Sequence, residues 1–251
     1  MSEGEDLNSI NRFEKNFAES VSFNEETARS YLEENGVDLD KFIKKGLNHI
    51  KSSSKKKEIR NSKSLFFKRV VLGAEIVNCL HMEKTFGHVK FMKLMYLCEQ
   101  VSNMKLSARY VKQAAGPYDA RFMHSIDKEF MRLKWFDVKV KSETKFRTYR
   151  YIPADNLLSY QKYFKNYYFK DRDNIAWLIK TFGKPPTSKV ELIATIYSCL
   201  DEFVKKNEEY STESLIEKVF DWSVEKKKKF TKENIINAHE WMIEKGLVPL
   251  S

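Results

Sequence analysis

Apolar residues recur at helical spacing in two neighbouring stretches near the middle of the chain. Residues 91–101 and 122–133 each carry apolar side chains three or four positions apart, which is the spacing of one face of a helix. Between these stretches stands the segment Gly116-Pro117-Tyr118-Asp119. Gly116 suits a turn that other residues disfavour, Pro117 suits the first position of a helix, and Asp119 suits its first turn. The pattern predicts a helix-turn-helix-like pair joined by a short structural turn.

A basic β-hairpin is predicted directly after this pair. Residues 135–140 and 146–152 are rich in β-forming side chains, and the polar residues 141–145 separate them. Helices followed by a basic hairpin are typical of a winged helix, in which the hairpin contacts DNA phosphates. The candidate DNA-binding residues are Lys139, Lys141, Lys145, Arg147 and Arg150.

The rest of the pattern divides the chain into five parts. We expect an acidic helical unit over 1–50, a basic linker over 51–64, a winged-helix module over 65–155, an aromatic-rich connecting helix over 156–184 and a C-terminal helical bundle over 185–251. The expected fold class is mainly α, with helix-turn-helix or winged-helix-like modules and one small β-hairpin.

Several helix boundaries follow from capping residues. Asp38 or Asp40 is expected to cap a helix that ends at Ile50. In the C-terminal part, Ser211 or Thr212 opens one helix and Thr231 opens the last. Three helices there predict a bundle of helix-turn-helix type, with residues 235, 236, 242 and 243 on the core face of the last helix.

Charge is unevenly distributed along the chain. The net charge is +10, yet residues 1–50 carry 6 basic and 11 acidic side chains, so the remainder is about +15. Basic residues gather in 51–63, in the predicted hairpin and in 226–229. A nucleic acid would neutralise them, and a solvated surface would also account for them. The excess of Lys over Arg favours the second reading, because base-reading side chains are more often Arg.

Composition narrows the class of protein. Hydrophobic residues make up 42% of the chain, and Gly and Pro number only 8 and 5, which indicates a folded, mainly helical protein. Apolar runs are too short for a membrane span and the first residues lack a secretory pattern, so we expect a cytoplasmic protein without membrane contact. Cys79, Cys98 and Cys199 lie on apolar helix faces and are expected to be buried free thiols.

Motifs for catalysis, metals and phosphate loops are missing from the sequence. It contains no HExxH, CxxC, GxSxG or glycine-rich phosphate loop, which predicts a protein with no enzymatic activity, no metal and no cofactor. His124 stands near Asp119 and Asp127 and could form a dyad, but no nucleophile accompanies it. A surface histidine is therefore the favoured interpretation.

Three segments resemble the Panacea (SocA-like antitoxin) domain. They are His88–Leu97, Ala114–Asp119 and Lys134–Phe136. Lys90–Leu97 matches the family's first helix, with Phe91 in place of the usual Leu.

The form Ala-Ala-Gly-Pro-Tyr-Asp is more similar still to a module at the C-terminal end of some type I restriction specificity subunits. Glu191–Tyr197, Asp221-Trp222 and Ala238–Pro249 are similar to the end of the same subunits, so the resemblance covers roughly residues 85–250. The target-recognition domains with which those subunits read DNA are absent from this chain.

The resemblance implies a non-enzymatic accessory protein of a bacterial defence locus. It would be antitoxin-like or associated with restriction-modification and phage defence, and would bind a toxin or a restriction-complex protein. The alternative is a winged-helix DNA-binding regulator that uses the basic hairpin. The two functions are compatible in one chain, and the oligomeric state stays open.

Overall fold

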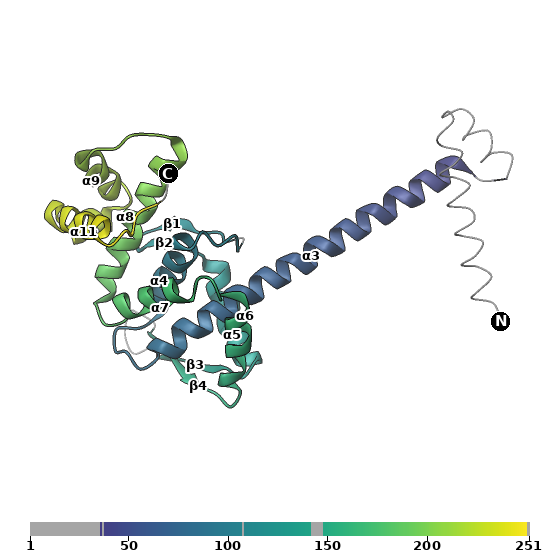
Figure 1. Ribbon diagram of the computed structural model, residues 1–251, viewed down its shortest axis with the longest axis horizontal. Coiled ribbons are helices and arrows are strands. Elements are labelled where there is room, and N and C mark those ends of the chain that lie inside the picture. The colour runs from purple at the N-terminus through teal and green to yellow at the C-terminus, as the bar shows by residue number, and fades with distance from the viewer. Residues whose placement is uncertain (1–35, 37, 107, 142–147, 250–251) are drawn as a thin grey trace. The chain divides into compact units, whose positions relative to one another are not determined.

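The computed structural model describes residues 36, 38–106, 108–141 and 148–249, and the chain divides into two compact units, residues 1–61 and 62–251. The described elements are mainly helices, accompanied by two small antiparallel hairpins (Figure 1). The helices are α3 (Leu39–Leu80), α4 (His88–Val101), α5 (Ala120–Arg132), the 3-10 helix η1 (Leu157–Tyr160), α6 (Gln161–Tyr167), α7 (Arg172–Gly183), α8 (Thr187–Lys206), α9 (Thr212–Phe220), α10 (Val224–Lys229) and α11 (Lys232–Glu244). The strands are β1 (Val111–Gln113), β2 (Gly116–Tyr118), β3 (Phe136–Lys141) and β4 (Thr148–Pro153).

Helix α3 corrects the predicted boundaries at the start of the chain. Its first turn is capped by Asp38, whose Oδ1 accepts a hydrogen bond from the Lys41 amide at 3.0 Å. The helix then continues unbroken to Leu80, so the helix end at Ile50 and the linker over 51–64 are wrong. Lys, Arg and Glu are good helix formers, so a segment without an apolar period can still be helical. Most of the predicted acidic unit lies outside the described residues.

The unit of residues 62–251 is built around one hydrophobic core. Helix α4 is buried over ten consecutive residues, 90–99, and packs against α7, α8 and β2. The C-terminal half of α3 also reaches it, because Gly73 brings the α3 backbone close to Phe91 and Ile126. Buried apolar side chains from Val70 to Leu247 join the same cluster. The three modules predicted over 65–251 therefore share one core.

The region between α4 and α5 differs from the predicted short turn. Residues 111–118 form a hairpin, in which Val111 pairs with Tyr118 and Gln113 with Gly116. Pro117 thus lies in β2 and not at the start of a helix, and Asp119 is the N-cap of α5 rather than part of its first turn. The prediction of a single hairpin is wrong for this reason, whereas the predicted hairpin near 135–152 is confirmed as β3–β4.

The segment predicted as one aromatic connecting helix is divided into η1, α6 and α7. Tyr160, Phe164 and Tyr168 point into the core, as expected of aromatic residues at helical spacing, while Phe169 is exposed. Among the helices of the described ranges, none is long and apolar enough to span a membrane.

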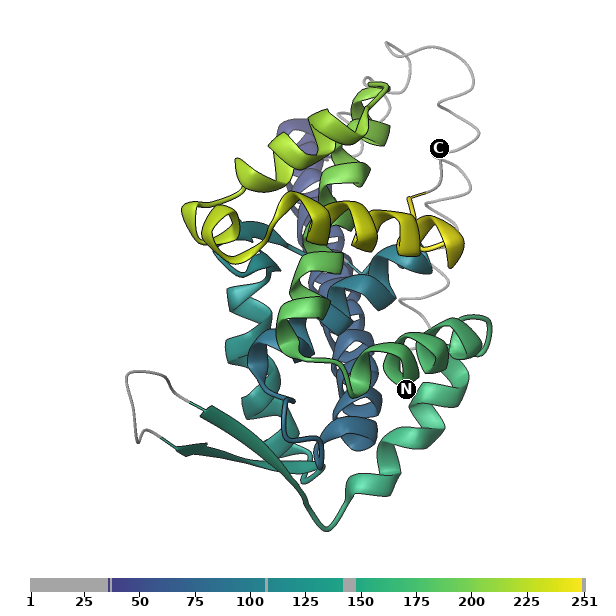
Figure 2. The same ribbon diagram turned by 90° about the vertical axis from the view of Figure 1, so that its left-hand side faces the viewer.

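The C-terminal part contains four helices where three were predicted. Ser211 and Thr231 are the N-caps of α9 and α11, each within a capping box. The additional helix is the six-residue α10. Figure 2 shows α11 lying across α8, with which it packs. Ile235 and Met242 face the core as predicted, but Ile243 is exposed, because the buried face follows Ile235, His239 and Met242.

Candidate functional site

The basic hairpin presents two of its predicted DNA-binding side chains together. Lys139 and Arg150 are directly opposed in the β3–β4 register and both are exposed, so they share the outer face of the hairpin. Lys141 ends β3, but its side chain lies outside the described residues, as do Lys145 and Arg147 altogether. Val138 and Tyr151 occupy the opposite face and pack against the core.

Gly116 is required by the backbone geometry of the second hairpin. Its φ is +97°, in the region that favours glycine, and a Cβ built there would lie 2.8 Å from Thr195 Oγ1 on α8. Gly116 and Pro117 are both buried. The predicted turn residues therefore form a tight contact between β2 and α8.

Asp119 belongs to a buried ionic network that joins α3, α4 and α5. Arg69 donates to Glu99 Oε1 and to Asp119 Oδ2, each at 2.8 Å, and to the Tyr110 hydroxyl at 3.2 Å. Asp119 Oδ1 also accepts the Phe122 amide at 3.0 Å. Burial raises the pKa of Asp119, but these hydrogen bonds outweigh it and hold that pKa below its usual value. Burial raises the pKa of Glu99 despite Arg69.

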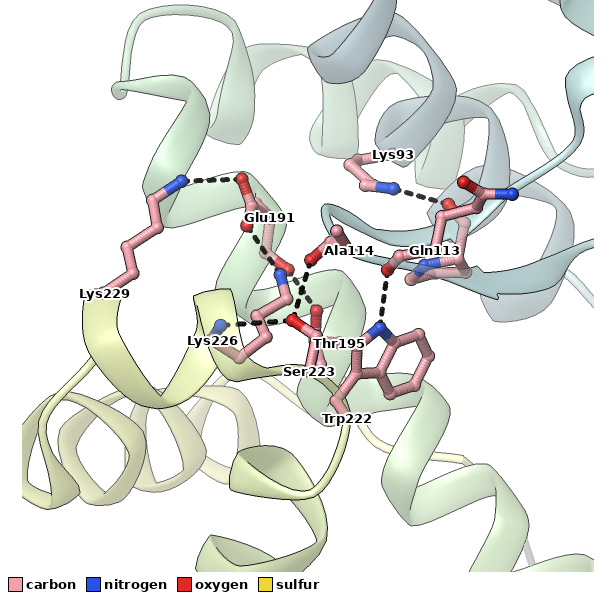
Figure 3. Close-up of polar contacts among 10 residues, drawn as sticks. Lys93, Gln113, Ala114, Glu191, Thr195, Trp222, Ser223, Lys226 and Lys229 are labelled. Atoms are coloured by element: carbon pink, nitrogen blue, oxygen red, sulfur yellow. Dashed lines mark hydrogen bonds and ion pairs between the residues drawn. The ribbon is translucent and has the colours of Figure 1, made fainter.

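A second polar cluster ties the C-terminal helices to the β1–β2 hairpin (Figure 3). Glu191 of α8 accepts hydrogen bonds from Lys226 at 2.6 Å and Lys229 at 2.8 Å. Just before α10, the Trp222 indole donates to the Gln113 carbonyl at 2.7 Å and the Ser223 hydroxyl approaches the Ala114 carbonyl at 3.5 Å. Side chains near residue 222 thereby hold residues more than a hundred positions earlier.

Lys93 lies beside this cluster and is fully buried. Its ammonium donates to the Pro117 carbonyl at 2.5 Å. Desolvation, and then the nearby charge of Lys226, lower the pKa of Lys93 to about 7, against the opposing effect of Glu191. Lys93 therefore holds β2 in place through a hydrogen bond that needs no permanent charge.

Lys90, one turn earlier on α4, is also fully buried. Its ammonium donates to Thr85 Oγ1 at 2.6 Å, to the Gly183 carbonyl at 2.7 Å and to the Pro185 carbonyl at 2.6 Å. Desolvation lowers the pKa of Lys90, with Glu83 acting in the opposite direction. Lys90 thus joins the start of α4 to the break between α7 and α8.

The structure pairs His124 with no carboxylate of the described residues, but it brings His88 and Asp127 together. His124 is exposed, and Asp119 is committed to Arg69 and the α5 cap. Instead, His88 Nε2 lies 3.1 Å from Asp127 Oδ2, and the Tyr151 hydroxyl donates to Asp127 Oδ1 at 3.0 Å. Such a pair could hold or move a proton, but the residues that line the adjacent 300 Å³ cavity include no serine or cysteine.

Thiols and metal ligands add little chemistry in the described part of the chain. Cys98 and Cys199 are buried as predicted, whereas Cys79 is exposed near the end of α3, so the prediction for Cys79 is wrong. Val77 and Leu80, its near neighbours, face the core and turn position 79 outward. No group of three or more His, Cys, Asp or Glu side chains among those residues is arranged to hold a metal.

The buried lysines are the feature that sequence reasoning missed. A signal for them exists, because Lys93 interrupts a stretch, residues 91–98, that is otherwise apolar on every face, and Lys90 directly precedes it. A helix that is apolar all round is a buried helix, and a charge within it must find partners.

No known protein family matches the sequence, and no curated protein matches it either.

Proposed function

We propose that this chain is a non-enzymatic accessory protein of a bacterial defence locus, antitoxin-like or restriction-associated, that acts in the cytoplasm by binding a partner protein. One observation carries the proposal. The polar residues of its Panacea-like segments are engaged in holding the fold: Lys90 and Lys93 bind main-chain carbonyls, and Asp119 binds Arg69 and caps α5. Groups used in this way supply a rigid frame and leave little for catalysis.

The same proposal interprets α4, α5 and the β3–β4 hairpin as a winged-helix-like arrangement. The helices would be the frame and the hairpin the wing. Of the motif residues of the resemblance, Lys90–Leu97 lie in α4, Gly116–Tyr118 form β2, and Asp119 caps α5.

A surface suited to a protein partner lies on the C-terminal helices. A cavity of about 570 Å³ is lined by apolar side chains of α8 and α11, including Ile193 and Trp241, and by Phe230 directly after α10. Two exposed lysines belong to its lining, of which Lys229 is paired with Glu191 and Lys189 has no ion pair within the described part of the chain, and no acidic residue is among the described residues that line it. A partner segment with apolar side chains flanked by carboxylates is complementary to this surface.

The test is co-expression of the full chain with the product of each flanking gene, one of them carrying an affinity tag. We expect one product to form a complex of defined stoichiometry that survives size-exclusion chromatography. Trp241→Ala should weaken that complex by roughly tenfold or more, as loss of an aromatic anchor does. The control is Trp177→Ala, which truncates a half-exposed tryptophan on α7 outside the cavity. A folded chain that binds none of the products contradicts the proposal.

A second candidate function is DNA binding through the wing, and the pairing of Lys139 with Arg150 on an exposed face favours it. Each phosphate contact contributes about −0.9 to the slope of log affinity against log salt. The double variant Lys139→Ala/Arg150→Ala should therefore flatten that slope by roughly 2 units in a titration with duplex DNA. Absence of binding at 50 mM salt, where electrostatic attraction is strong, rejects this candidate.

A further inference from the structure

A second cavity, of about 550 Å³, lies at the edge of β4. It is bounded by the loop before α4, the first turn of α4, the first residue of α8 and residues 148–150. Tyr118 and Tyr149 give it aromatic walls, and the Tyr149 ring is stacked on His88 with centroids 3.4 Å apart. This cavity has no part in the contacts proposed for the protein partner.

The cavity is lined by an excess of positive charge. Lys84, Lys90 and Arg150 all contribute to its wall, and none of its described lining residues is Asp or Glu. Two carboxylates lie outside the lining: Asp127 contacts His88 and Tyr151, and the charge of Glu83, next to Lys84 in sequence, acts on Lys90 without contacting it. Lys84 and Arg150 are exposed, so both side chains are free to contact a ligand from solvent.

Lys90 adds a buried positive charge to the cavity wall. Its ammonium is fully buried, and the three oxygens that it contacts are neutral. Among the ion pairs of the described residues none involves Lys90 or the equally buried Lys93, whereas the buried cations Arg69 and Lys226 each pair with a carboxylate. A buried charge with no carboxylate in direct contact is costly, and for Lys90 an anion in the adjacent cavity would offset that cost.

The remaining polar groups of the wall suit a phosphate. The cavity wall includes the start of α4, a 14-residue helix whose N-cap, Gly87, offers no side chain to its first amides. Amides of a first helical turn have no acceptor within the helix. Phosphate groups are commonly bound by such amides together with Lys and Arg.

We infer that this cavity binds a phosphate group, carried either by a free nucleotide or by the backbone of a nucleic acid. The bidentate donors of Arg150 and the ammonium of Lys84 would contact the phosphate oxygens directly. Lys90 would act through its field from beneath the wall. The inference is independent of the partner-protein proposal, since it uses different residues and a different ligand.

The experiment uses the full chain and three probes: inorganic phosphate, ATP and a fluorescent single-stranded oligothymidylate. We expect ATP or the oligothymidylate to bind the wild-type protein at 50 mM salt. Inorganic phosphate should compete with the bound probe and displace it. The variant Lys84→Gln/Arg150→Gln should weaken binding by roughly tenfold or more, since it removes two charge-assisted contacts. Both positions are exposed, so circular dichroism should show an unchanged fold.

Lys165→Gln/Lys170→Gln is the matched control. Both lysines are exposed and lie outside the cavity lining, and the control removes the same charge as the double variant. Binding by the control equal to wild type supports the cavity, and an equal loss in both double variants overturns it in favour of a general attraction of phosphate to positive charge. ATP binding with phosphate displacement supports a nucleotide as the source; oligothymidylate binding with phosphate displacement, without ATP binding, supports a nucleic-acid backbone. Failure of all three probes to bind wild type overturns the inference.

Discussion

At the scale of single residues, one glycine and two lysines hold buried positions between elements of the core. Gly116, predicted to lie in a turn, is buried between β2 and α8 with a φ of +97°. Lys90 and Lys93 are fully buried and bind carbonyl oxygens. Gly116 and Lys93 let β2 lie close to α8 and α4, whereas Lys90 joins α4 to the segment between α7 and α8.

The cost of a side chain at position 116 can be measured directly. Gly116→Ala combines an unfavourable φ with a Cβ 2.8 Å from Thr195 Oγ1, and we expect it to lower the free energy of unfolding by roughly 2–5 kcal/mol. The matched control is Gly246→Ala, since Gly246 has a φ of +63° with no atom within 4 Å. It should cost only about 1–2 kcal/mol. Urea denaturation that gives equal losses for the two variants would contradict the contact with Thr195.

Lys93 should make the stability of the fold depend on pH. Its pKa is about 7 in the folded protein and 10.5 in its ordinary state. Between these values the unfolded chain holds a proton that the folded chain does not, so the free energy of unfolding rises with pH from about 7 to 10.5. The slope approaches about 1.4 kcal/mol per pH unit, and below pH 7 this contribution is constant.

The variant Lys93→Met tests this dependence. Between pH 7 and 9 it should reduce the slope of the free energy of unfolding against pH by about 1.4 kcal/mol per pH unit, the amount expected for one proton. Urea denaturation at several pH values measures this slope. Lys93→Arg keeps a charge at every pH, so it should also remove the slope while lowering stability most above pH 7. A wild-type slope in Lys93→Met would show that Lys93 does not titrate in this range.

At the scale of elements, the sequence predicted those features that depend on residues close to one another in the chain. The faces of α4 and α5, the β3–β4 hairpin and the caps Ser211 and Thr231 follow from residues close in sequence. The β1–β2 hairpin was missed because strands of three residues, one containing Pro117, carry no alternation to recognise. The candidate site was found only in part, since Lys90 meets Gly183, 93 positions away, and no local pattern encodes that contact.

The tie between α8 and α10 depends on Glu191. Glu191→Gln leaves the buried Lys226 without its carboxylate, and we expect a loss of about 3–5 kcal/mol in the free energy of unfolding. Hydrogen exchange should rise in α10. Glu202→Gln is the matched control, because Glu202 also accepts two lysines, Lys112 and Lys218, but is partly exposed. That change should cost less than about 1 kcal/mol. Equal losses in the two variants would show that the buried Lys226–Glu191 pair stabilises the fold no more than the partly exposed pairs of Glu202.

At the scale of the molecule, the described part of residues 62–251 shares one hydrophobic core. Side chains from α3, α4, α5, α7, α8, α9 and α11 belong to one apolar cluster. Helix α8 is central to it, since Ile193, Ile196 and Leu200 are buried and α8 packs against α4. Polar contacts join the same elements, because Lys90, Arg69 and Trp222 each contact segments far apart in sequence.

This shared core predicts the outcome of truncation. A fragment of residues 62–251 retains every buried apolar residue of the cluster, so it should unfold in a single cooperative transition with heat. A fragment of residues 62–184 loses α8 and exposes the face of α4 that packs on it. We expect that fragment to keep helical circular dichroism, to bind ANS and to lack a cooperative transition, as a molten globule does. The division into modules predicted from the sequence implies the opposite, namely that residues 65–155 fold by themselves. A sharp thermal transition in the 62–184 fragment would therefore show that this part folds without the C-terminal helices.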